Sequence, residues 1–326
     1  MHAPKKVMLA ALIAAGVAVA PSLAQAQQKF PTKPVRIVVP TSAGGQNDTM
    51  ARMIGLKMSE SWKQPVVVEN RPGASGTLGA AMAAKAAPDG YTLLFPGVTI
   101  ATSAALQRNL PYDPLKDFTG VTQIGLNTYT LVVAPALGVK SVNELVALAQ
   151  ARPGKILYGS PGAGSFQHLM GERFRLAAGF NAVHVAFTGG PQTAIETLAG
   201  RIQYSNVGLG VSLPFITDGK LLALAVYLPQ RSLHLPDVPV MAETLPDFKR
   251  PDGSYGLLAP ARTPRPILNQ ISKEVARIFA LPDVKVRMHA ISFVPAPSTP
   301  EEYDKILRAE IDTLSKVVRD AGLRST

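Results

Sequence analysis

The feature that most constrains this fold is a regular alternation of β-branched apolar runs with amphipathic helical patterns. Strands are predicted at 35–39, 66–68 and 91–95, with helices at 48–62 and 77–86 between them. A β-α-β-α-β order requires parallel strands that are joined by helical crossovers. The first part of the chain is therefore predicted to be an α/β unit, with 66–68 as a buried strand.

A second series of the same kind follows. Strands are predicted at 131–133, 155–158, 182–185, 202–207 and 222–226, and helices at 141–151, 165–178, 192–198, 266–280, 282–289 and 299–321. A chain of 326 residues is long enough for two domains. We expect an α/β protein of two lobes. Residues 27–126 plus 227–326 would form lobe 1 and 127–226 lobe 2, although periodicity alone does not assign the C-terminal helices to the first lobe.

The N-terminus has the three-part pattern of a secretory signal peptide. Lys5 and Lys6 precede the apolar run 7–20, and Ala24-Gln25-Ala26 is a small-x-small cleavage sequence. The run is shorter than the roughly 20 residues that span a bilayer. We therefore expect residues 1–26 to be removed by cleavage and the mature protein to be secreted without a lipidated cysteine.

Composition and motif searches disfavour several classes of function. The chain has no cysteine, so a thiolate metal site and a cysteine nucleophile are excluded. The net charge is +11, but no run of five Lys or Arg occurs and aromatic residues are only 6%, which disfavours nucleic acid as a partner. The histidines lack metal-site spacing, and no P-loop, dinucleotide fingerprint or G-x-S-x-G occurs. We expect no metal, no cofactor and no enzymatic activity.

Each series contains a strand, a glycine-containing turn and the start of a helix. The first turn is 41–47 and the second is 159–164. Glycine lets the backbone approach a ligand closely, and the first turn of a helix offers unpaired N–H groups and a positive dipole end. One such turn alone is more often a simple connection, but two at the carboxyl ends of strands favour a shared anion site.

Residues beside these turns have alternative interpretations. His168 is either a helix-capping or packing residue or a donor near the ligand, and His184 is predicted to be a core residue of a buried strand. Asp48 is expected to stabilise a helix N-terminus and order its loop rather than act as an acid or base. Thr188 and Gly189 belong to a third candidate ligand loop, between a strand and a helix.

Ten stretches, in order along the mature chain, resemble the periplasmic receptors of tripartite tricarboxylate transporters, the Bug receptors. They are KPVRIVVP at 33–40, Gly44-Gly45 with Asp48, Ala51 and Arg52, VVVENRPG at 66–73, APDGYTLL at 87–94, LPYDPLKDF at 110–118, Tyr158-Gly159-Ser160, His184-Val185, Gly189-Gly190, LPDVP at 235–239 and YGLLAP at 255–260. Ten matches in the same order identify the family more specifically than any single match does.

The resemblance implies a periplasmic, two-lobe Venus-flytrap fold whose cleft captures a small carboxylate for a two-subunit membrane permease. It carries ligand binding over to Thr41, Ser42, Ala43, Gly44, Gly45 and Asn47, and to Ser160, Gly162, Ala163, Gly164 and Ser165. It also implies that Gly76, Val98 and Thr99 line the cleft. With His168, Thr188, Gly189 and Asn206, these residues complete the predicted site of a receptor that we expect to be a monomer.

Two positions depart from the family pattern. Thr188 stands where the family often has Lys, and the strand ending at Asn206 lacks the usual acidic residue. The missing acid disfavours a ligand with an ammonium group, and Tyr204 nearby favours a simple or aromatic acid. A periplasmic sensor that signals to a membrane kinase is the alternative function, and a hydrolase is a weaker one.

Overall fold

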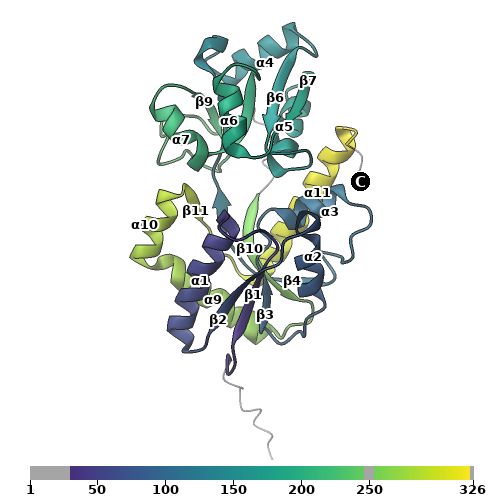
Figure 1. Cartoon of the computed structure of the whole chain (residues 1–326), viewed down its shortest axis with the longest axis vertical. Coiled ribbons are helices and arrows are strands. Elements are labelled where there is room, and N and C mark those ends of the chain that lie inside the picture. The colour runs from purple at the N-terminus through teal and green to yellow at the C-terminus, as the bar shows by residue number, and fades with distance from the viewer. Residues whose placement is uncertain (1–29, 246–252, 324–326) are drawn as a thin grey trace, which may run out of the picture. The chain divides into compact units, whose positions relative to one another are not determined.

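The computed structural model describes residues 30–245 and 253–323, so the predicted signal peptide at 1–26 lies outside the described residues. Pro31–Thr326 forms one compact unit. Its strands form two sheets, one of six strands and one of five (Figure 1).

The six-stranded sheet has the order β11-β4-β10-β3-β1-β2. Its strands are β1 (Val35–Val39), β2 (Val66–Asn70), β3 (Thr92–Leu94), β4 (Phe118–Asn127), β10 (Ser254–Pro260) and β11 (Phe293–Pro295). β1 pairs in parallel with β2 and β3, which confirms the predicted crossovers. β10 runs antiparallel to β3 and β4, and β11 runs antiparallel to β4, so the sheet is mixed.

The five-stranded sheet has the order β7-β6-β8-β5-β9. Its strands are β5 (Tyr129–Val133), β6 (Ile156–Ser160), β7 (Ala182–Ala186), β8 (Tyr204–Gly208) and β9 (Leu222–Val226). β6 is parallel to β7 and β8, whereas β5 is antiparallel to β8 and β9. This sheet is also mixed, with its parallel strands at one side.

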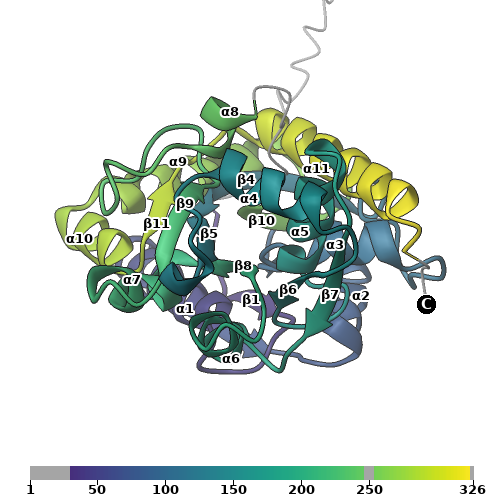
Figure 2. The same cartoon turned by 90° about the horizontal axis from the view of Figure 1, so that it is seen from above.

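Helices cover both faces of each sheet (Figures 1 and 2). Around the six-stranded sheet they are α1 (Gln46–Trp62), η1 (Ala74–Gly76), α2 (Thr77–Ala84), α3 (Thr99–Leu106), α9 (Arg265–Ala280), α10 (Pro282–Ala290) and α11 (Pro300–Asp320). Around the five-stranded sheet they are α4 (Val142–Ala151), α5 (Phe166–Ala177), α6 (Gly190–Leu198) and α7 (Leu209–Thr217); the short segments η2 (Pro135–Leu137) and α8 (Met241–Thr244) lie in connections. α1 packs with α9, and α3 with α11, while α9 and α11 both contact β4.

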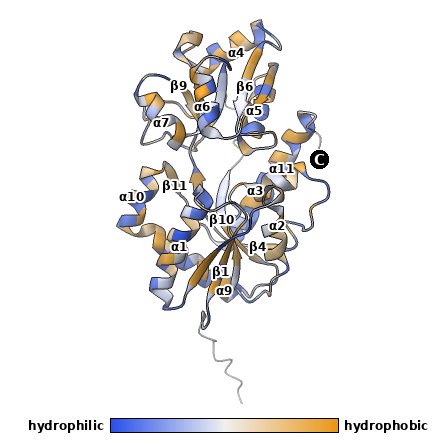
Figure 3. Cartoon of the chain, viewed as in Figure 1, coloured by the Kyte–Doolittle hydropathy of each residue, from blue (hydrophilic) through white to orange (hydrophobic). Residues whose placement is uncertain are grey.

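The apolar pattern explains where the core lies. Val35, Ile37, Val38 and Val39 of β1 are all fully buried, as expected for a strand with helices on both faces. Figure 3 shows the hydrophobic colouring along β1 and more polar colouring on α1 and α10. One buried apolar cluster contains residues of both sheets, including Leu94 and Tyr158.

Two helices begin at residues whose side chains cap them. Ser141 precedes α4 and its hydroxyl accepts the Glu144 N–H at 3.2 Å. Thr299 precedes α11 and forms a capping box with Glu302: the Thr299 hydroxyl accepts the Glu302 N–H, and the Glu302 carboxylate accepts the Thr299 N–H at 2.8 Å. These local signals fix where the two helices begin.

Two predictions about burial are wrong. β2 was expected to be buried, but it is an edge strand and Val67 is 53% exposed. β7, which contains His184, is also an edge strand, and Val183 is 47% exposed. A β-branched run indicates a strand without fixing its place in a sheet, because that place depends on distant strands.

The chain passes directly from one sheet to the other at Thr128, between the end of β4 at Asn127 and the start of β5 at Tyr129. All strands from β5 to β9 belong to the second sheet, and β10 returns to the first. The division into lobes at 127 and 227 stays a prediction, because the contacts unite Pro31–Thr326 in one compact unit.

We predict that Gly256→Ala lowers the free energy of unfolding by roughly 1–3 kcal/mol, the usual range for overpacking a core. A Cβ at Gly256 in β10 would overlap the ring of Tyr303, which is fully buried. Denaturant unfolding measures the change.

The control is Gly210→Ala in α7, where the nearest atom to a new Cβ is the Ile291 carbonyl oxygen at 3.7 Å. Alanine favours a helix over glycine by about 1 kcal/mol, so this variant should be as stable as the parent or more so. Equal stability of the two variants would contradict the packing argument.

Candidate functional site

The two predicted glycine loops occupy equivalent places in the two sheets. The first connects β1 with α1, and the second connects β6 with α5. Both follow the carboxyl end of a strand that is paired in parallel on both sides. Open α/β sheets place ligands outside this edge.

Asp48, in the first turn of α1, anchors the first loop. Its Oδ2 accepts the Gly44 N–H at 2.9 Å, and its Oδ1 lies 2.9 Å from Nε of Arg52. The hydrogen bond from Arg52 holds the pKa of this buried carboxyl below its usual value, and burial opposes the shift. The interpretation of Asp48 as a loop-ordering residue is confirmed.

The hydrogen bonds of Arg52 also connect the first loop to the neighbouring strand β2. Arg52 donates to Oδ1 of Asn70 at 3.0 Å, and Nδ2 of Asn70 donates to the carbonyl of Thr41 at 3.2 Å. Asn70 is the last residue of β2. The loop is thus held at Thr41 and at Gly44 by side chains that come from two different elements.

His168, in the first turn of α5, anchors the second loop in the same way. Its Nδ1 accepts the Gly164 N–H at 3.0 Å, four residues back, as Asp48 does for Gly44. Its own N–H donates to the hydroxyl of the N-cap residue Ser165 at 3.2 Å. The imidazole is buried and Nδ1 carries no proton, so the capping interpretation of His168 matches the geometry.

Behind the second loop, His184 contacts both Ser160 and the ring of His168. Oγ of Ser160 lies 2.7 Å from Nε2 of His184, and Oγ of Ser165 donates to Oγ of Ser160 at 3.3 Å. The rings of His168 and His184 stack with centroids 3.8 Å apart. Burial lowers the pKa of both histidines. For His184, burial together with the charge of the neighbouring His168 lowers the pKa to about 4.

Other predicted residues of the first sheet gather beside the first loop. Nδ2 of Asn47 and the hydroxyl of Thr99 both donate to the carbonyl of Pro96, at 3.3 and 2.7 Å. A Cβ at Gly76 would lie 3.4 Å from Oγ1 of Thr99 and 3.3 Å from the Pro40 carbonyl oxygen, and the φ of Gly76 is +91°. The structure therefore brings 40–47, 76 and 96–99 together.

Several polar groups of these loops have no hydrogen-bond partner within the described residues. They are the N–H groups of Gln46 and Asn47 at the start of α1, and those of Phe166 and Gln167 at the start of α5. The hydroxyl of Thr41 is also buried without a partner there. Such groups are the ones a bound anion can satisfy.

Asn206, the third residue of β8, is fully buried. Its Oδ1 accepts the Tyr227 hydroxyl at 2.8 Å, whereas its Nδ2 has no partner in the described part of the chain. A buried amide nitrogen without an acceptor is costly and calls for an explanation.

The third candidate loop is organised by Gln192. Its Oε1 accepts the N–H of Thr188 at 3.1 Å and the hydroxyl of Thr188 at 2.7 Å. Thr188 is exposed, and both of its donors are used within the loop. Gly189 is the N-cap of α6 in an extended conformation with φ 167°.

Each glycine loop also lies close to a residue of the six-stranded sheet or of its helices. Nδ2 of Asn127, at the end of β4, donates to Oε1 of Gln46 at 3.4 Å. A Cβ at Gly164 would lie 3.0 Å from Cδ1 of Leu106, the last residue of α3.

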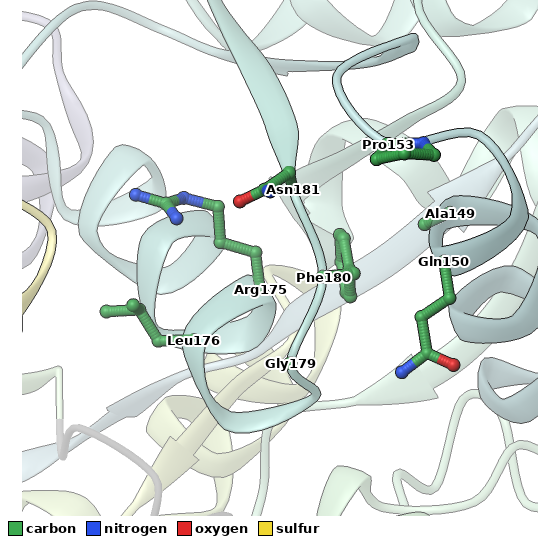
Figure 4. Close-up of a pocket in the computed structure, with 8 residues that line it drawn as sticks. All are labelled: Ala149, Gln150, Pro153, Arg175, Leu176, Gly179, Phe180 and Asn181. Carbon is green, nitrogen blue, oxygen red and sulfur yellow. The ribbon is translucent and has the colours of Figure 1, made fainter.

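Three cavities in the described structure are lined by residues outside the two glycine loops. One of about 420 Å³ is lined by α4, α5 and the turn before β7, including Gln150, Arg175 and Asn181 (Figure 4). It lies at the amino end of β7, whereas the second loop follows the carboxyl end of the parallel strand β6. The others, of about 1010 and 230 Å³, contain Val286 and Arg262, respectively.

Within 30–245 and 253–323, no group of three or more His, Asp or Glu side chains is placed to hold a metal ion. In the same residues, no helix has the length and apolarity required to cross a bilayer.

Comparisons with known proteins agree on one family. The model of the family described as "Tripartite tricarboxylate transporter family receptor" matches residues 50–323. Protein BugT of Bordetella pertussis is 32% identical over 298 residues, which cover 90% of this chain and 91% of BugT. The resemblance to the Bug receptors is thereby confirmed.

Two solved structures contain bound carboxylates. Rpa4515 of R. palustris with adipate is 32% identical, with a TM-score of 0.74 over 90% of this chain and 98% of that one. MatC of Rhodopseudomonas palustris with bound malate is 28% identical, with a TM-score of 0.69 over 89% of this chain and 100% of that one. The two-lobe fold is that of periplasmic binding proteins, as predicted.

The pKa of His184 is about 6.5 in the unfolded chain and about 4 in the folded chain. We predict that the free energy of unfolding falls as the pH drops from the first value toward the second. In this window the unfolded chain binds a proton that the folded chain does not, so protonation favours unfolding. His184→Gln should flatten the dependence in denaturant unfolding between these pH values. Equal slopes for the parent and the variant would contradict the role of His184.

Proposed function

Because the chain belongs to the family of tripartite tricarboxylate transporter receptors, we propose that it is a non-enzymatic periplasmic receptor that captures a small carboxylate for transport. Binding rather than catalysis is supported by the family description and by relatives that hold carboxylates. The mature receptor would act as a monomer and deliver its ligand to a two-subunit membrane permease.

The observation that carries this proposal is the matched pair of anchored loops. In each, a side chain of the following helix accepts one glycine N–H, and the first two N–H groups of that helix are left without acceptors in the described chain. A carboxylate accepts several hydrogen bonds at once and is favoured by the positive end of a helix dipole. No fixed cation is required at either loop.

The charge of Asp48 does not oppose an anion at the first loop. Arg52 neutralises it through the ion pair at 2.9 Å. The second loop has a histidine at the equivalent position, and burial lowers its pKa, so this residue is neutral near pH 7 and adds no charge. Both loops therefore keep the positive character of their helix ends.

We further propose a simple or aromatic carboxylate without an ammonium group. The predicted site has no acidic residue that could pair with an ammonium group, and Asn206 offers a buried amide nitrogen that lacks an acceptor among the described residues. A second carboxylate or a carbonyl of the ligand would satisfy that nitrogen. Adipate and malate, which relatives hold, belong to this class.

We predict that adipate, malate or benzoate stabilises the purified mature chain in a thermal-shift assay, whereas aspartate does not. A ligand at 100 times its Kd adds about 2.7 kcal/mol to the free energy of unfolding. Stabilisation by aspartate alone would contradict the proposed ligand class, and no shift with any small carboxylate would contradict the function.

We predict that Ala43→Trp abolishes this ligand-induced shift and leaves the unliganded protein folded. Ala43 is exposed in the first loop, so an indole there would fill the binding region without disturbing the core. The control is Ala276→Trp on the exposed face of α9. It should retain the parent shift, and a retained shift in Ala43→Trp would place the ligand elsewhere.

A further inference from the structure

The largest of the three cavities, about 1010 Å³, lies apart from the predicted ligand loops. Its walls are α10, β11, the end of α9 at Phe279, the crossing residues Leu126 and Thr128, and the segment 228–234. None of the residues predicted to bind the transported carboxylate lines it. The proposed function therefore leaves this cavity without a role.

The walls are joined by direct contacts, so the cavity belongs to the fold. β11 pairs with β4 from Phe293 to Pro295. The Thr128 N–H donates to the Ser292 carbonyl at 3.4 Å, and Nε2 of His234 lies 2.9 Å from the His289 carbonyl oxygen. Val294 also packs against the apolar cluster that contains Leu228.

The lining is mainly apolar and partly open to solvent. Leu233 is 85% exposed and Val286 is 71% exposed, although both are large hydrophobic residues. Leu126, Phe279 and Phe293 form the inner wall. A concave surface of this size with an apolar lining is typical of a site for a ligand with a hydrocarbon part.

The polar residues of the cavity favour a negative charge. Arg231, Lys285, His234 and His289 line it, and no Asp or Glu does so among the described residues. Arg231 is paired with Glu243, whereas the described residues provide no carboxylate partner for Lys285. An anion that enters the cavity would meet an uncompensated ammonium group and no acidic side chain.

Ser292 supplies an independent indication of a ligand. This residue lines the cavity and is only 4% exposed, and its hydroxyl is buried without a partner among the described residues. Its backbone lies in the left-handed region with φ 55°, which is unfavourable for a non-glycine residue. A strained serine with an unsatisfied hydroxyl is more easily explained if a bound molecule supplies the hydrogen bond.

We propose that this cavity is a second binding site, for a free amphipathic monocarboxylate. The hydrocarbon chain would contact Val286, Leu233 and the inner wall, and the carboxylate would be held by Lys285 and by the Ser292 hydroxyl. The site is separate from the loops that are proposed to bind the transported solute.

The test is isothermal titration calorimetry of the mature chain with octanoate, compared with octanol and octylammonium. Octanoate should bind, and both analogues should bind more weakly, since neither carries the carboxylate. Lys285→Gln should weaken octanoate binding about three- to fivefold, the effect of losing one exposed ion pair, and leave octanol unchanged. The control is Lys273→Gln on the exposed face of α9, outside the cavity, which should bind as the parent does.

A second variant tests the apolar wall. Val286→Glu changes an exposed residue of α10, so the fold should persist, and it should lower octanoate affinity by about tenfold or more through lost contact and repulsion. Ala43→Trp should retain octanoate binding, which separates this site from the solute site. The proposal is overturned if octanoate does not bind, if octanol binds equally, if neither cavity variant has an effect, or if Ala43→Trp abolishes binding.

Discussion

The site depends on one interaction that occurs twice: a side chain in the first turn of a helix accepts the N–H of a glycine four residues earlier. Asp48 holds Gly44 and His168 holds Gly164, and both side chains are buried. Each hydrogen bond fixes a loop before any ligand arrives, so less conformational entropy is lost on binding. The hydrogen bond uses the glycine N–H, whereas the first N–H groups of the helix remain available to the ligand.

The two anchors achieve the same geometry with different chemistry. The carboxylate of Asp48 requires Arg52, and Arg52 in turn positions Asn70 and through it Thr41. The imidazole of His168 requires no counterion and instead stacks against the ring of His184. The first loop is thus supported by an ion pair and an amide, and the second by a cluster of aromatic rings that includes Tyr158.

Local sequence signals predicted many of the elements and both anchored turns, but not the assembly of the sheets. The strand-glycine-helix pattern located both loops, and Asp48 was correctly interpreted. β4 and β10 were missed, because Gly120, Gly125 and Gly256 interrupt their apolar patterns and their pairing joins residues more than a hundred positions apart. The burial of β2 and β7 was wrong, and the large cavity could not be foreseen, since both depend on contacts between distant segments.

The first of the two passages between the sheets consists of a single residue, Thr128, whose N–H donates to the Ser292 carbonyl and whose carbonyl accepts the Leu209 N–H at 2.8 Å. So short a link cannot let one sheet slide past the other. Any reorientation must act as a pivot, carried by the torsions of two or three consecutive peptides and opposed by these two hydrogen bonds. Movement of one sheet relative to the other is therefore restricted at Thr128.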